Sequence, residues 1–347
     1  MLDIPSPSHL YTDIICPHCH YTGSHESKGW RRCTSASPVQ RRLCTSCNRS
    51  FSMRTNTIMH GTRSTISQVI SALHARTEGV GLRAAGRLVK KSHPTIASWE
   101  VKAKKLGEQL DQEAPVNYNV ILESDELYTK VGKNYPPSLS TGWTACSIER
   151  KSRYCTKHVT GLRVKNLFEA HTNIVLNFVG QTNAHMLSDG EGRYASSLWR
   201  HKQMRTTLTS AERNGKRGRP KGTFICLRKG IVVQRKVKGS QNKRKRRSRY
   251  ETPLPHHPDS ILLADTDIHA NHSEAYNSSL RRRSSAFRRR TNMYAKCNEG
   301  LDRALGAQRV VYNWIRPHFF HKKTPAQSIG WVAQAITFED FVRIQIT

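Results

Sequence analysis

The sequence contains few acidic residues and no long hydrophobic run. Among its 347 residues, 25 are Asp or Glu and 57 are Lys or Arg, which leaves a formal net charge of +32. An excess of this size repels itself unless a polyanion offsets it, so nucleic acid is the expected partner. No segment approaches the roughly 18 consecutive apolar residues that a transmembrane helix needs, and the N-terminus lacks the basic and apolar regions of a signal peptide. We therefore expect a cytoplasmic, nucleoid-associated protein without a membrane partner.

The hydrophobic content of 36% is low for one continuous core, although apolar clusters recur along the chain. This combination favours several folded modules over a disordered chain. The fold class that we expect is multidomain α+β.

Nine cysteines in a chain without a signal peptide are expected to be metal ligands and free thiols. Two pairs follow a C-x2-C pattern: Cys16 and Cys19, then Cys44 and Cys47. Each pair on a tight turn directs two thiolates at one tetrahedral ion, and the intervening segment folds back as a hairpin. This predicts a structural Zn²⁺ site in a zinc ribbon over residues 12–55, with unligated cysteines as the alternative. Three nearby residues lie close enough to substitute as ligands, namely His18, His20 and Cys33, but we expect them to be unligated because the two C-x2-C pairs already satisfy the metal.

Residues 61–110 have the apolar periodicity of short helices. Apolar side chains recur at three- and four-residue steps over 66–73 and 82–89, and a third helix is predicted over Pro94–Leu106 with Ser92 as its N-cap. Three short helices with a basic final one resemble a helix-turn-helix, and the alternative is a small bundle that connects domains. The recognition helix would span Thr95 to Lys104. Three residues on one face would enter the major groove: Thr95, Ser98 and Lys102.

Acidic residues cluster where the next segment changes to strands. A strand is predicted over 116–123, and it ends in the cluster Glu123, Asp125 and Glu126. Further strands are predicted at Trp143–Ile148, His158–Leu162 and His185–Ser188, with helices near 167–178 and from Gly192. The strand at 185–188 places Asp189 at its C-terminal end.

Residues 200–250 form a basic tract with 19 Lys and Arg and a single acidic residue. Its R-G-R-P-K core resembles an AT-hook, in which Gly and Pro flatten the backbone so that two Arg side chains lie along an A·T minor groove. The core consists of Arg217, Gly218, Arg219, Pro220 and Lys221. A solvated basic linker is the alternative. We also expect a hairpin within Thr223–Lys238.

A helix predicted over 272–284 places Glu274, Asn277 and Arg281 on one face. Together with Asp125 and Asp189, Glu274 completes three carboxylates in the order needed for two-metal phosphoryl transfer. Such carboxylates hold two Mg²⁺ about 4 Å apart. Asn277 and Arg281 would position a phosphate. Periodicity does not establish that the carboxylates meet, and other third ligands stay open: Asp265, Asp267 and Glu299.

Five segments occur in the order found in DDE transposases of the bacterial insertion sequence 1 type, which the chain resembles over most of residues 12–330. They are LCTSCNRSF, GLRAAGRLVKKSHPTIASWEVK, SDELYTKVG, SDGEGRYASSLW and NHSEAYNSSLRRRSSAFRRRTNMYAK. The resemblance implies an RNase H-like catalytic domain, a mixed sheet flanked by helices, with Asp125, Asp189 and Glu274 as catalytic residues. It also implies Mg²⁺ or Mn²⁺ chemistry on the ends of a mobile element. The partner would be double-stranded DNA, both terminal inverted repeats and target, on which the protein assembles as a homo-oligomer.

The resulting domain prediction has five parts. They are a zinc ribbon (12–55), a helix-turn-helix (61–110), a first part of the catalytic core (116–200), a basic insertion (201–255) and a last part of the core with the Glu helix (256–335). The function expected is a transposase that cleaves and joins DNA strands. Two alternatives remain: a non-catalytic, domesticated DNA-binding regulator, and a nuclease acting on RNA–DNA hybrids, for which a helix-turn-helix has no evident use.

Overall fold

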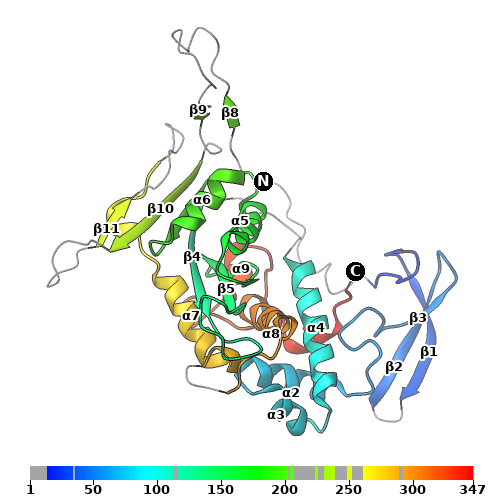
Figure 1. The fold of residues 1–347 in the computed structure, drawn as a ribbon. Coiled ribbons are helices and arrows are strands. Elements are labelled where there is room, and N and C mark those ends of the chain that lie inside the picture. The colour runs from blue at the N-terminus through cyan, green and yellow to red at the C-terminus, as the bar shows by residue number, and fades with distance from the viewer. Residues whose placement is uncertain are drawn as a thin grey trace.

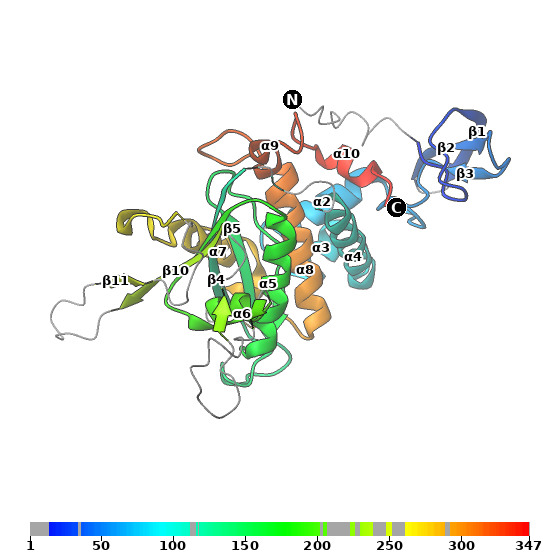
Figure 2. The same ribbon diagram turned by 90° about the horizontal axis from the view of Figure 1, so that it is seen from above.

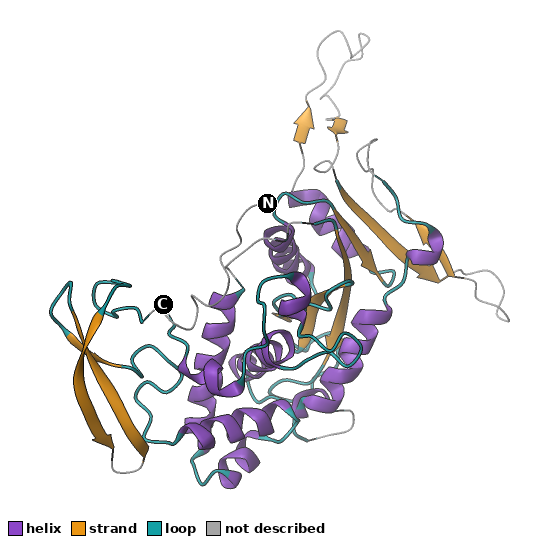
Figure 3. Cartoon of the chain, turned by 180° about the vertical axis from the view of Figure 1, so that it is seen from behind, coloured by secondary structure: helices purple, strands orange, loops and turns teal. Residues whose placement is uncertain are grey.

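The computed structural model describes residues 14–33, 36–111, 116, 118–201, 204–206, 223–225, 230–238, 248–251, 261–288 and 292–346. The chain has the mixed α+β character that we expected. A small antiparallel sheet lies at one end of the molecule, and helices separate it from a larger mixed sheet (Figure 1, Figure 3). In the described part of the chain, no helix is both long and apolar enough to cross a lipid bilayer.

The small N-terminal sheet consists of three strands. β1 (His25–Cys33) and β2 (Ala36–Cys44) pair as an antiparallel hairpin, and β3 (Ser50–Ser52) pairs with β2. The hairpin joins the two C-x2-C turns, as their spacing predicts. The described part of this module has few buried apolar residues, namely Cys16, Val39, Cys44 and Phe51. A core this small contributes little stability without a further cross-link.

Three helices follow at the positions that periodicity predicts: α2 (Ile66–Thr77), α3 (Leu82–Leu88) and α4 (His93–Leu110). Thr65 and Gln68 form a capping box at the start of α2. Ser92 is the N-cap of α4, as predicted, but its hydroxyl lies 2.8 Å from the Thr95 hydroxyl and caps no backbone N–H.

These helices share one hydrophobic core with the C-terminal part of the chain. α8 (Asn298–Val310) packs along α4, and a Cβ at Gly107 would overlap the Val310 side chain, so this close crossing requires a glycine. The remaining C-terminal elements are the π-helical turn η4 (Val311–Ile315), α9 (Pro325–Ile329) and α10 (Phe338–Arg343). The largest side chains of the shared core are Trp99, Trp314 and Phe341.

The central sheet has the strand order β11-β10-β7-β4-β5-β6. Its strands are β4 (Val120–Tyr128), β5 (Trp143–Glu149), β6 (Val159–Gly161), β7 (Ala184–Ser188), β10 (Ile231–Lys238) and β11 (Ser248–Glu251). β4, β5 and β6 are antiparallel neighbours, whereas β7 is parallel to both β4 and β10. The predictions for β5, β6 and β7 are confirmed to within two residues.

Helices cover both faces of the central sheet (Figure 2). α5 (Lys165–Val179) and α6 (Gly192–His201) lie on one face, where Val175 and Leu198 pack with Val120 of β4. α7 (Asn271–Arg283) and α8 lie on the other, where Tyr276 and Leu301 pack with Cys146 of β5. The predictions of α5, α6 and α7 are confirmed. Successive side chains of β4 therefore alternate between the α7 face and the α5/α6 face.

The strand predicted over 116–123 is wrong in its limits. β4 begins at Val120 and continues to Tyr128, so Asp125 lies inside the strand rather than after its end. Because charged side chains are rare inside sheets, the acidic cluster was interpreted as the end of the strand. In the folded protein Glu123 pairs with Arg150 and Glu126 pairs with Arg163, and these partners allow the strand to continue.

The hairpin predicted within Thr223–Lys238 is also wrong. β9 (Thr223–Ile225) pairs with β8 (Met204–Thr206), while β10 joins the central sheet parallel to β7. The local pattern identified strand-forming residues correctly, but it carried no information about the strands with which they pair.

Candidate functional site

The four cysteines of the C-x2-C pairs converge at the base of the small sheet. The Sγ atoms of Cys16 and Cys47 are 3.6 Å apart, as are those of Cys19 and Cys44, and all four atoms lie within 4.8 Å of one another. The two turns are alike, because the N–H groups of His20 and Asn48 donate to the carbonyls of Cys16 and Cys44 at 2.9 Å.

This cluster has the donor set and compactness of a structural tetrahedral metal site, such as one for zinc. His18 and His20 are exposed and do not belong to the group of four. The Cys33 side chain lies outside the described part of the chain. The four predicted ligands are therefore brought together as a set.

Asp125 and Asp189 lie together in the central sheet, at the end where β7 terminates. β4 and β7 are neighbouring parallel strands, and Ser124 pairs with Ser188 in their register. The next residue along each strand is one of the two predicted carboxylates. Both line a small polar pocket of about 180 Å³ that also includes Gly190. Tertiary structure thus unites two of the three predicted carboxylates.

The pocket concentrates negative charge. Burial, together with the charges of Glu126 and Asp189, raises the pKa of Asp125 to about 6. Within the described ranges, neither Asp125 nor Asp189 forms an ion pair with a basic side chain. A bound cation would stabilise these two carboxylates, because they share one pocket and repel each other.

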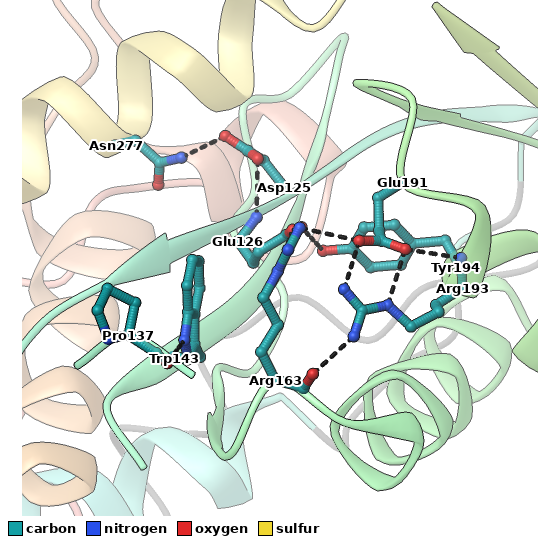
Figure 4. Close-up of polar contacts among 9 residues, drawn as sticks. All are labelled: Asp125, Glu126, Pro137, Trp143, Arg163, Glu191, Arg193, Tyr194 and Asn277. Atoms are coloured by element: carbon teal, nitrogen blue, oxygen red, sulfur yellow. Dashed lines mark hydrogen bonds and ion pairs between the residues drawn. The ribbon is translucent and has the colours of Figure 1, made fainter. Parts of the chain in front are cut away.

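The other two carboxylates of the pocket, Glu126 and Glu191, are neutralised by arginines (Figure 4). Arg163 bridges them, since it donates to Glu126 through Nε at 2.9 Å and to Glu191 through Nη2 at 2.8 Å. Arg193 also pairs with Glu191 at 2.6 Å, and the Tyr194 hydroxyl donates to Glu126 at 3.1 Å. Sequence reasoning missed both arginines, because arginine is abundant in this chain and neither stands out. The E-G-R pattern of residues 191–193 was the available signal.

The buried carboxylate of Glu123 fixes the start of α7. It accepts the backbone N–H groups of His272 at 2.7 Å and Ser273 at 3.2 Å, and Arg150 donates to it at 2.8 Å. Although burial opposes ionisation, the pKa of Glu123 is lowered by the donors His272 and Arg150. An ionised carboxylate at a helix N-terminus is favourable for both hydrogen bonding and the helix dipole. Glu123 therefore anchors α7 on β4.

One turn further along α7, Asn277 makes a second contact with β4. Its Nδ2 donates to Asp125 Oδ2 at 2.7 Å (Figure 4). Glu274 lies three residues earlier on the same helix, exposed, and is not among the residues that line the pocket. Asp267 and Glu299 do not line it either, and the Asp265 side chain is outside the described part. Of the candidate third ligands, Glu274 alone is on the helix that contacts Asp125.

A buried group of two thiols and one imidazole lies under α7. Cys146, which faces Asp125 across the β4–β5 register, belongs to it together with Cys155 and His158, and the potential ligand atoms lie within 4.8 Å of one another. The Tyr276 hydroxyl is 2.8 Å from His158 Nε2. This group could hold a metal ion, and the sequence offered no spacing that predicted it.

The predicted recognition helix has an exposed N-terminal half. Ser98 is exposed and Thr95 is half-buried. Lys102, however, donates its ammonium to the carbonyls of Ile58, at 3.2 Å, and His60. Burial also lowers the pKa of Lys102. Its side chain is turned toward the protein, which argues against Lys102 as a base-contacting residue.

Basic side chains instead surround the α3–α4 turn. A shallow pocket there is lined mainly by basic residues, namely Arg83, Arg87, Lys90, Lys91 and His93. On α7, Arg281 is half-buried and Asn277 is buried against Asp125 rather than free to bind a phosphate. The AT-hook-like residues 217–221 lie outside the described residues.

The chain matches no model of a known protein family and no curated protein.

Proposed function

We propose that this protein is a DDE-type transposase, which binds the ends of its mobile element and catalyses metal-dependent cleavage and strand transfer of DNA. The observation that carries the proposal is the placement of Asp125 within β4 and of Asp189 directly after β7, its parallel neighbour. Both line one pocket beside a helix that bears Glu274. Three hard anionic side chains from separate elements are what two-metal phosphoryl transfer requires.

The central sheet and the helices on its two faces support an RNase H-like core. A mixed sheet carries α5 and α6 on one face and α7 and α8 on the other. The thiol cluster supports a zinc ribbon, and α2–α4 with the basic α3–α4 turn support a helix-turn-helix. Assembly as a homo-oligomer on double-stranded DNA belongs to the same proposal.

The pocket residues fit a divalent cation such as Mg²⁺ or Mn²⁺. Their donors are carboxylate oxygens. Burial, and then the charges of Glu126 and Asp189, raise the pKa of Asp125, and a bound cation would favour its ionised form. When bound, the metal ions would neutralise charge that develops on the phosphoryl oxygens during in-line attack by water and then by a 3′-hydroxyl.

The surrounding side chains orient this pocket. Asn277 holds one oxygen of Asp125. Arg163 holds Glu126 and Glu191 in ion pairs, so that among the described residues Asp125 and Asp189 are the carboxylates of the pocket without an ion pair. Glu123 anchors α7, so that Glu274 lies one turn from the residue that contacts Asp125. Glu274 is the proposed third ligand, although its exposed side chain lies outside the pocket in this structure.

A second candidate, a non-catalytic DNA-binding regulator, is favoured by one observation. Glu274 does not line the pocket in this structure, whereas the basic α3–α4 surface is complete without any carboxylate. The two functions differ in whether Asp125 and Asp189 are needed for anything beyond DNA binding.

The test is a strand-transfer assay with duplex DNA that carries the inverted repeats flanking the gene, in Mg²⁺ or Mn²⁺. Asp125→Asn, Asp189→Asn and Glu274→Gln should each reduce joining by roughly 10²- to 10³-fold or more while end binding persists. Asp267→Asn and Glu299→Gln are the matched controls and should join normally. Absence of joining by the wild type, with end binding intact, would favour the regulator. If Glu274→Gln joins normally and a control does not, the third ligand is misassigned.

A further inference from the structure

Two adjacent phenylalanines project into solvent from the loop before α9. Phe319 is 87% exposed and Phe320 is 78% exposed, and Phe319 is the most exposed large hydrophobic residue in the described part of the chain. Exposed single apolar residues are common on protein surfaces, but two neighbouring phenyl rings at this exposure indicate a surface that binds something.

The loop that carries these rings has a defined structure. The His318 N–H donates to the Lys323 carbonyl at 2.8 Å, and the Lys322 N–H donates to the His318 carbonyl at 2.9 Å. Lys322 adopts a left-handed backbone with a φ of 55°. At the end of the loop, a capping box formed by Thr324 and Gln327 starts α9. The rings are therefore presented on a hydrogen-bonded turn that is tied to a helix at its base.

The chemistry around the rings favours a polyanionic partner. Lys322 Nζ lies 4.2 Å from the centroid of the Phe319 ring, and the segment from Arg316 to Thr324 contains basic residues and no acidic one. Aromatic rings interleaved with cations are the features by which proteins bind unpaired nucleic-acid bases, since every base has a face that stacks and a phosphate that attracts positive charge.

The loop begins beside the end of α7. Arg316, which precedes the loop, pairs with Glu78, and Arg283 in the last turn of α7 pairs with the same carboxylate at 3.1 Å.

We infer that Phe319 and Phe320 stack on unpaired or unstacked nucleotides of the DNA that this protein binds. This inference rests on the proposed function, because it assigns the loop to the same DNA. The rings would replace stacking lost where the duplex opens, and Lys322 and Lys323 would contact the adjacent phosphates. The ligand class is DNA with a locally disrupted duplex, without a requirement for a particular base.

The experiment compares two 30-base-pair duplexes of the same sequence, one fully paired and one with a central two-base mismatch, in titrations with the full-length protein. The wild type should bind the mismatched duplex about tenfold more tightly or better. The Phe319→Ala/Phe320→Ala double variant should bind both duplexes equally, with its affinity for the paired duplex unchanged. The Phe319→Trp/Phe320→Trp variant should keep the preference. Tyr135→Ala/Leu139→Ala, which removes two other exposed apolar side chains, is the matched control and should also keep it.

Three results would overturn the inference. They are a wild type without preference, a double-alanine variant that keeps the preference, and a double-alanine variant that loses binding to both duplexes equally. Binding to vesicles of anionic lipid that requires both phenylalanines, with DNA binding unaffected, would assign the loop to a membrane instead. Failure of the proposed function is distinguished by strand transfer: a protein that joins DNA normally but lacks the mismatch preference refutes the inference alone. Retained joining by Asp125→Asn refutes the catalytic assignment alone.

Discussion

The thiol cluster of the small sheet and the Asp125/Asp189 pocket of the central sheet are assembled in different ways. In the small sheet, each pair of thiols comes from one turn, and a single hairpin brings the two turns together. In the central sheet, Asp125 and Asp189 meet because β4 and β7 are neighbours in strand order, although a strand pair and a helix separate them in the chain. The first site depends on local spacing and the second on topology. Damage to the first should therefore unfold a module, whereas damage to the second should remove the proposed activity and leave the fold intact.

The largest effect should follow loss of a thiol from the small sheet. Cys44→Ser should abolish the metal site and unfold residues 14–52, because metal binding supplies on the order of 10 kcal/mol of folding energy in small modules. Limited proteolysis should release this segment and leave the central sheet protected. Zinc content should fall from one ion per chain to none.

Cys297→Ser is the control, since Cys297 is a free and exposed thiol. Zinc content that survives Cys44→Ser would contradict the prediction. Two ions per chain, one of them lost with Cys155→Ser, would show that the buried group beneath α7 also binds metal.

A smaller but still large effect is expected at Glu123, which the topology of the central sheet brings to α7. Glu123→Gln leaves the guanidinium of Arg150 partly buried without its carboxylate and weakens the cap of α7. The free energy of unfolding should fall by about 3–5 kcal/mol, the usual result of breaking a buried pair on one side. Urea denaturation measures this loss.

The control for Glu123 is Glu339→Gln, which breaks an exposed i,i+4 pair with Arg343 on α10. Surface pairs of this kind contribute about 0.5 kcal/mol or less. Equal effects of the two substitutions would mean that Glu123 does not anchor α7.

The unneutralised charge at Asp125 should appear as a dependence of stability on pH. The pKa of Asp125 is raised from 3.8 to about 6 in the folded state, so the folded protein binds this proton more tightly than the unfolded chain. Its contribution to stability is therefore present below pH 3.8 and is lost as pH rises toward 6. Asp125→Asn should remove this loss and stabilise the Mg²⁺-free protein at pH 7 by about 1–3 kcal/mol.

Denaturation of the wild type and the Asn variant at pH 5 and pH 7, with zinc content checked at both, measures the difference. Added Mg²⁺ should stabilise the wild type and leave the variant unchanged. A variant less stable than the wild type at pH 7 would show that the carboxylate is structurally required.

The smallest effects are expected in α4. The sequence pattern places Lys102 on the DNA-binding face of this helix, whereas its ammonium contacts backbone carbonyls of the protein. Lys102→Ala removes hydrogen bonds to the carbonyls of Ile58 and His60, so it should cost about 1 kcal/mol of stability without altering DNA preference. Ser98→Ala should leave stability unchanged and reduce preference for the element's ends. Thermal denaturation measures the stability of both variants, and competition binding measures their preference for the element's ends. If Lys102→Ala lost this preference, Lys102 would contact DNA after all.

Much of the secondary structure was predictable because it follows from neighbouring residues. The helices α2 to α5 show apolar side chains at helical spacing, and β5 and β7 are short apolar runs between polar segments. The limits of β4 were not predictable in the same way, because Glu123 and Glu126 remain in the strand only through Arg150 and Arg163. The partner of β10 was likewise not encoded in its own pattern.

The candidate site divides in the same manner. The scarcity of acids drew attention to Asp125 and Asp189, and their positions next to predicted strands were informative. The roles of Glu123 and Arg163 had no such signal, because their partners are far away in the sequence. Asn277 was predicted to position a phosphate, yet it contacts Asp125 directly.

By itself the sequence determined the excess of positive charge, the thiol set of the small sheet and the existence of most helices and strands. These properties depend on composition or on residues only a few positions apart, where spacing largely dictates geometry. Only the tertiary structure decided which carboxylates share a pocket, which of them arginines neutralise, where Lys102 points and that Phe319 and Phe320 stay exposed. Those outcomes depend on strand order and helix packing, which the free energy of the whole chain selects and no local pattern contains.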